Sequence, residues 1–113
     1  MKSTIEKINN FRDERNWRQF HNEKDLAISI SLEANELLEI FQWKTSEEAV
    51  ANDLQHIKEE LADVFIYGLM LADNLNLAVE KIISDKIKLN AKKYPVPESF
   101  GNKEKYTELN KEK

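Results

Sequence analysis

The chain has 113 residues, of which 41% are hydrophobic and 34% are charged, a composition typical of one globular domain and not of a disordered segment. The absence of cysteine excludes disulfides and thiolate metal sites, and a net charge of −4 lacks the basic excess of a nucleic-acid-binding surface. With only two glycines and two prolines, the chain favours long helices.

The first three helices are predicted from helical spacing of apolar residues. Residues 3–16 form the first helix, in which Ser3 followed by Glu6 resembles a capping box. Residues 24–43 and 53–76 form the second and third, because their apolar residues fall on one arc of a helical wheel. The irregular segment between the first two helices predicts a loop.

A fourth helix is predicted over residues 77–93, and it ends at Tyr94 because the following proline disfavours the α conformation there. Residues 44–54 are expected to connect the second and third helices through a short helical turn that Ser46 caps. The polar composition of residues 95–113 predicts an irregular tail.

These elements predict one all-α domain over residues 1–113, an antiparallel four-helix bundle ordered over about residues 3–94. The N-terminus lacks an apolar signal core, and the longest nearly apolar run, residues 61–72, is too short to span a bilayer. We therefore expect a soluble, cytoplasmic protein that binds neither membrane nor nucleic acid.

Two pairs of acids lie within apolar stretches. Glu33 and Glu36 are three residues apart on the second helix, and Glu60 and Asp63 have the same spacing on the third, so each pair shares one helix face. Converging carboxylates repel by about 4 kcal/mol per pair at ~4 Å and a dielectric constant of ~20. Proton uptake or a divalent cation relieves this repulsion, and carboxylate oxygens suit Mg²⁺ or Mn²⁺. Spacing alone leaves a solvated helix face and a metal site equally open.

A ferritin-like di-iron centre is disfavoured, because it needs two Glu-x-x-His motifs on different helices and the nearest match is a single Asp-x-x-His. Without cysteine, thiol chemistry is excluded, and no Gly-rich phosphate loop is visible in the sequence.

From about residue 11 to residue 109, four segments resemble the MazG-like all-α nucleoside triphosphate pyrophosphohydrolases, especially the short branch that includes dCTP pyrophosphatases. They read ERNWRQFH, SLEANELLEIFQWK, IKEELADVFIYGLMLA and NAKKYP followed by KYTEL. The resemblance implies Mg²⁺-dependent cleavage of a (d)NTP, dCTP or another dNTP, to (d)NMP and pyrophosphate, in the house-cleaning of nucleotide pools. It also implies a homodimer or homotetramer, and an apolar strip at Ile28 and Leu32 favours such an oligomer face.

The resemblance assigns the metal-binding and catalytic roles to Glu33, Glu36, Glu60 and Asp63. It places the substrate at Trp17, His21, Trp43, Tyr67, Asn90, Lys93 and Tyr94.

Other roles stay open at this point. Glu39 matches an acid that the family often keeps, and it acts as a base or supporting group or lies on a solvated surface. Arg15 and Lys24 are weaker candidates for substrate contacts. The two tryptophans also suit a hydrophobic core. A phosphoribosyl-ATP pyrophosphohydrolase is the alternative enzyme, and a non-catalytic helical scaffold, with its acids exposed and separated, is the alternative from another class.

Overall fold

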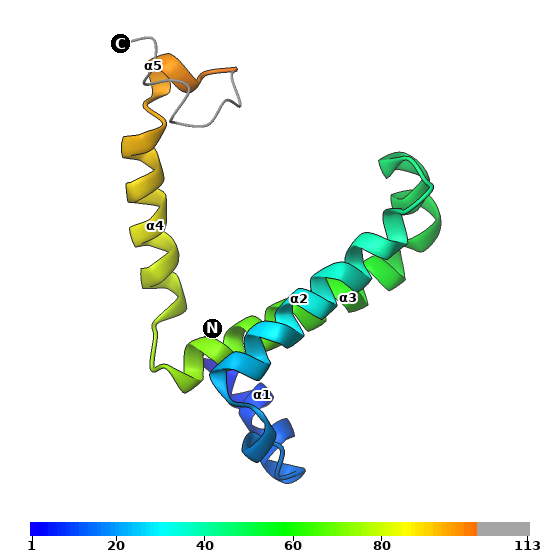
Figure 1. Ribbon diagram of the computed structural model, residues 1–113, viewed down its shortest axis with the longest axis vertical. Helices are drawn as coiled ribbons and strands as arrows, with labels where there is room; N and C mark the ends of the chain where they lie inside the picture. Colours follow the sequence, from blue (N-terminus) through cyan, green and yellow to red (C-terminus); the bar gives the residue numbers. More distant parts are fainter. Residues whose placement is uncertain (102–113) are drawn as a thin grey trace. The chain divides into compact units, whose positions relative to one another are not determined.

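The computed structural model describes residues 1–101, and all the regular secondary structure in this part is helical (Figure 1). The elements in chain order are α1 (Lys2–Glu14), the 3₁₀ turn η1 (Arg18–Phe20), α2 (Glu23–Phe41), α3 (Ser46–Asn74), α4 (Val79–Lys93) and α5 (Val96–Ser99). The predicted all-α fold with four long helices is confirmed. The chain forms two compact units, Met1–Leu77 and Ala78–Lys113.

The first unit is built on the antiparallel pair α2 and α3, which lie side by side along most of α2, with α1 packed against α3 (Figure 1). Leu26 and Ile40, two positions of the apolar arc predicted for the second helix, are buried. Ile8 of α1 and Leu69 and Met70 of α3 are buried as well. The core of this unit thus contains predicted arc positions of α1 and α2, whereas Leu69 and Met70 lie outside the arc predicted for the third helix.

Helix α3 begins seven residues earlier than the sequence predicts, since it starts at Ser46 instead of residue 53. Thr45 is the N-cap, with an extended backbone and a side chain that accepts a 3.1 Å hydrogen bond from the Glu48 N–H. The cap predicted at Ser46 is therefore wrong by one residue. The predicted helical turn is the first part of α3, which is kinked at Asp53, where φ is −124° and ψ is 24°.

The second unit contains α4 and the single turn α5, which lies in the segment predicted to be irregular. Helix α4 begins at Val79, two residues later than predicted, after Asn76 adopts a left-handed conformation with φ of 55°. The rest of the predicted tail, residues 102–113, lies outside the described residues. No single helix within residues 1–101 is long and apolar enough to cross a membrane, although α3 and α4 counted together meet the length and composition criteria.

Candidate metal and nucleotide site

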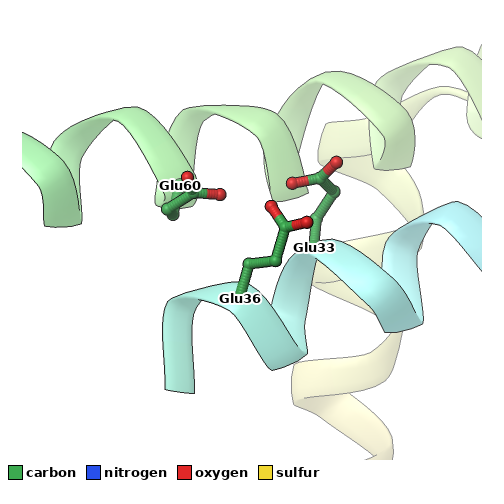
Figure 2. A group of neighbouring side chains, drawn as sticks. All are labelled: Glu33, Glu36 and Glu60. Carbon is green, nitrogen blue, oxygen red and sulfur yellow. The ribbon is translucent and has the colours of Figure 1, made fainter. Parts of the chain in front are cut away.

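Three acids from two helices meet in the first unit. Glu33 and Glu36 project from adjacent turns of α2, and Glu60 faces them from α3 (Figure 2). One carboxylate oxygen of each lies within 4.8 Å of the others. The convergence follows from the i, i+3 spacing on α2 and from the antiparallel packing of α2 against α3.

These carboxylates are poorly satisfied by the protein itself. One oxygen of Glu33 and one of Glu60 are buried without a hydrogen-bond partner among the described residues. The other Glu60 oxygen lies 3.4 Å from His56 Nε2. Buried acceptors without partners are costly, and two such oxygens beside a third carboxylate suit the all-oxygen ligation of a hard divalent cation. The donor set therefore fits Mg²⁺ or Mn²⁺.

The electrostatics of the cluster point the same way. Burial raises the pKa of Glu33 from 4.5 to about 7, and Glu36, Asp63 and Glu60 add to this effect. Burial also raises the pKa of Glu60, with further contributions from Glu36 and Asp63, whereas the nearby His56 lowers it. Without a cation, Glu33 and Glu60 therefore hold their protons more tightly than isolated glutamates do.

Asp63 differs from the other predicted ligands. It lies outside the group of three converging oxygens and lines a neighbouring pocket instead. Its charge nevertheless acts on Glu33 and Glu60, since it raises the pKa of both. Asp63 thus connects the acid cluster to the pocket.

This pocket has a volume of about 410 Å³, within the range of small-molecule sites. Its walls come from α1, from the α1–α2 connection (residues 15–22) and from α3. It is lined by Lys7, Ile8, Phe11, Trp17, His21, Asp63, Ile66, Tyr67 and Met70.

Aromatic rings form one wall of the pocket. The Trp17 ring stands edge-on to Phe11 and His21, with centroids 5.6 and 6.5 Å away. The Arg15 guanidinium lies 3.8 Å above the Phe11 ring. Trp17 keeps 42% of its surface exposed, so it is not the core residue that the alternative interpretation required. Its exposed surface is available to a flat ligand.

Two polar side chains of the pocket are held in their neutral forms. Burial lowers the pKa of His21 below its ordinary value of 6.5, and the charges of Arg12 and Arg18 lower it further. The His21 Nδ1 atom is buried and has no hydrogen-bond partner within residues 1–101. Burial raises the pKa of Tyr67, as do the charges of the nearby acids. At neutral pH the pocket therefore offers an uncharged imidazole and a protonated phenol.

Other predicted residues lie outside this pocket. Trp43 follows α2 in a left-handed conformation and is 93% exposed. Asn90, Lys93 and Tyr94 belong to the second unit, so their predicted substrate role stays a prediction.

Glu39 lines a second hollow of about 360 Å³ on the other side of the acid cluster, together with Glu36, His56 and Glu60. Lys24 lies in the first turn of α2 and is exposed.

The sequence-based prediction missed five residues of the pocket, namely Lys7, Ile8, Phe11, Ile66 and Met70. Phe11 lies three residues after Ile8 and four after Lys7, and Met70 lies four after Ile66, so each set shares one helix face. This spacing was the available signal, but it indicates a buried face equally well.

A protein-family model described as the MazG-like family matches residues 28–109, which is most of the chain. The chain belongs to the MazG-like family. The match begins within α2, so the α1 wall of the pocket lies outside it.

Curated relatives of this MazG-like chain include dCTP pyrophosphatase 1 of Rattus norvegicus, which is 36% identical over 104 residues, and that of Homo sapiens, which is 35% identical over the same length. Both alignments cover 88% of the chain and 61% of the relative, so the chain spans about three fifths of the length of these proteins. A solved pyrophosphatase from Archaeoglobus fulgidus DSM 4304 is 39% identical, with a TM-score of 0.80 over 84% of this chain and 92% of the other.

Proposed function

We propose that this protein is a metal-dependent nucleoside triphosphate pyrophosphohydrolase, which cleaves a (d)NTP between the α and β phosphates to release (d)NMP and pyrophosphate. The observation that carries the proposal is the meeting of Glu33, Glu36 and Glu60, with buried oxygens lacking partners, beside a pocket with an aromatic wall. A scaffold module would have its acids exposed and separated, and the geometry disfavours it.

In this proposal Glu33, Glu36, Glu60 and Asp63 hold Mg²⁺, with Mn²⁺ as a substitute. The cation would supply positive charge for the triphosphate and for the attacking water. The carboxylates fix its position and orient the water toward the α phosphorus. Asp63, which borders both the cluster and the pocket, sets the distance between phosphates and nucleoside.

The pocket is proposed to hold the base and sugar. Its aromatic wall offers a stacking surface at Trp17, and the neutral His21 can donate one hydrogen bond and accept one. Tyr67 keeps its phenolic proton and donates to a sugar or phosphate oxygen. The names of the curated relatives support dCTP or a similar pyrimidine nucleotide as the substrate. A role in the house-cleaning of nucleotide pools follows from this reaction.

We further propose that the chain forms a homodimer or homotetramer. Ile28 and Leu32, one turn apart on α2, are 47% and 59% exposed, and Leu61 and Phe65, one turn apart on α3, are 38% and 61% exposed. Apolar side chains exposed in this pattern are typical of surfaces that associate. Light scattering after size exclusion measures the assembly directly.

The activity is tested with purified protein, Mg²⁺ and a panel of dNTPs and phosphoribosyl-ATP. We expect pyrophosphate and the monophosphate as products from a dNTP. Glu36→Gln and Asp63→Asn are expected to lower kcat at least about 100-fold, because each removes a charge from the proposed metal site. Glu59→Gln changes the same charge on an exposed part of α3 and serves as the control.

Several outcomes of this experiment would count against the proposal. Release of orthophosphate alone would indicate a different reaction. Cleavage of phosphoribosyl-ATP without any cleavage of a dNTP would favour the alternative enzyme. Full activity of either cluster variant would show that the acids do not form the metal site.

A further inference from the structure

A buried arginine lies behind the aromatic wall of the pocket. Arg12 of α1 has 0% of its side chain exposed. Its Nε donates to Asn9 Oδ1 at 3.0 Å, and its Nη2 donates to Asp73 Oδ2 at 3.3 Å and to Asn74 Oδ1 at 3.1 Å. A guanidinium loses much hydration on burial, and these partners replace it at Nε and Nη2, while Nη1 is buried without a hydrogen-bond partner within residues 1–101. We call these four residues the Arg12 network.

The backbone on either side of η1 is hydrogen-bonded, after it to a side chain of the Arg12 network and before it to the main chain at the end of α1. The Asn74 side chain donates to the His21 carbonyl at 2.7 Å. The Trp17 N–H donates to the Arg12 carbonyl at 2.8 Å. The α1–α2 connection is therefore fixed at the two residues that carry pocket rings, Trp17 and His21.

Apolar packing contributes little to holding this connection. None of the three η1 residues is buried, and Phe20 is 62% exposed. The connection also contains Asn16 in a left-handed conformation, with φ of 54°. A short exposed segment of this kind has low local stability unless polar contacts fix it. The Arg12 network supplies such contacts from the C-terminal end of α3.

We propose that Arg12 and Asn74 are positioning residues of the nucleoside pocket, which hold the α1–α2 connection so that Trp17 and His21 face α3. The assignment of a nucleotide as the ligand rests on the proposed function. The network itself consists of residues outside the acid cluster and is not among the pocket-lining residues. A substitution in the Arg12 network should therefore weaken nucleotide binding and leave the chemical step intact.

The decisive variant is Asn74→Asp. An aspartate keeps an acceptor for Arg12, but when ionised it cannot donate to the His21 carbonyl. Asn76→Asp makes the same chemical change two residues away, at an exposed position, and is the matched control. For the fluorescence measurement the variants are made in a Trp43→Phe background, which leaves Trp17 as the single tryptophan of the chain. For the kinetic measurement they are made in the wild-type chain, because Trp43 is itself a predicted substrate residue.

Each of the two readouts is compared with that of its own parent protein. We expect the KM for dCTP to rise about tenfold in Asn74→Asp, as the loss of one hydrogen bond to an ordered segment implies, with kcat changed less than about twofold. We also expect acrylamide to quench Trp17 fluorescence more strongly in Asn74→Asp than in the control. Quenching needs neither nucleotide nor turnover, so it tests the positioning role even if the proposed activity fails.

An unchanged KM together with unchanged Trp17 quenching would overturn the proposal. A fall in kcat at constant KM would also overturn it, because that result places the network in the chemical step. If circular dichroism shows that Asn74→Asp does not fold, Asn74→Ser carries the same expectations, since serine shortens the donor without adding a charge.

Discussion

Replacing Glu33 with glutamine should stabilise the cation-free protein at alkaline pH and reduce its stabilisation by Mg²⁺. Glu33 has a buried oxygen without a described hydrogen-bond partner and lies against Glu36 and Glu60. Its negative charge therefore destabilises the folded state when no cation is bound, and it stabilises the folded state when a cation is bound. A glutamine keeps the size of the side chain and removes the charge.

The pH dependence follows from the pKa of Glu33, which is about 7 in the folded protein and 4.5 as an ordinary glutamate. The folded state therefore binds this proton more tightly than the unfolded state does. The stabilisation that comes from this tighter proton binding is fully present below pH 4.5, declines as the pH rises, and is lost above about pH 7. The difference between wild type and Glu33→Gln should thus grow across this interval.

The same two pKa values of Glu33 set the size of the stability difference between wild type and Glu33→Gln. One pKa unit corresponds to about 1.4 kcal/mol, so the full effect of a shift from 4.5 to about 7 would be about 3.5 kcal/mol. Glu33 is only half-buried, and solvent screening reduces this to about 1–2 kcal/mol. For a domain of this size the corresponding rise in Tm is roughly 4–8 °C.

Thermal unfolding followed by circular dichroism measures the effect at pH 5 and pH 8, in EDTA and in excess Mg²⁺. Glu59→Gln, which removes the same charge outside the cluster, controls for the change in net charge. A Glu33→Gln protein that is no more stable than wild type in EDTA at pH 8 would refute the electrostatic argument. An undiminished Mg²⁺-dependent rise in Tm would refute Glu33 as a ligand.

Two further predictions concern the pocket and the core. Because the pKa of His21 lies below its ordinary value, the imidazole is neutral at pH 7.5, and the KM for dCTP should rise as the pH falls below 6.5. A His21→Gln variant should lose this rise, and a pH profile of KM that is identical in both proteins would exclude the role. Leu26→Ala should lower the free energy of unfolding by about 2–5 kcal/mol in urea, because the side chain is only 1% exposed. Leu38→Ala, at a 65% exposed position of the same helix, should cost less than about 1 kcal/mol, and equal losses would contradict the assigned core.

Several features of the protein could be predicted from local patterns. The bounds of α1, α2 and α4 agree with the predictions to within two residues, because apolar spacing and breakers are local signals. The i, i+3 spacing of Glu33 and Glu36 placed both carboxylates on one face of α2. The burial of Leu26 and Ile40 followed from the same periodicity.

Other features depend on which helix faces meet, and no local pattern specifies that. The spacing of Glu60 and Asp63 placed both acids on one face of α3, but it did not indicate that Asp63 also lines the pocket, which forms once α1 packs against α3. The start of α3 was also missed, because the Thr45 cap and the kink at Asp53 interrupt the apolar pattern that the prediction followed.

The burial of Arg12 is the clearest case of a feature that only the tertiary structure decided. Its partners Asp73 and Asn74 are 61 and 62 residues away along the chain, and they meet it only after α1 has packed on the C-terminal end of α3. The sequence by itself determined the helices and the faces that carry the acids, since helical geometry repeats every few residues. The pocket and its supports depend on side chains far apart in the sequence, whose proximity is set by the free energy of packing whole helices together.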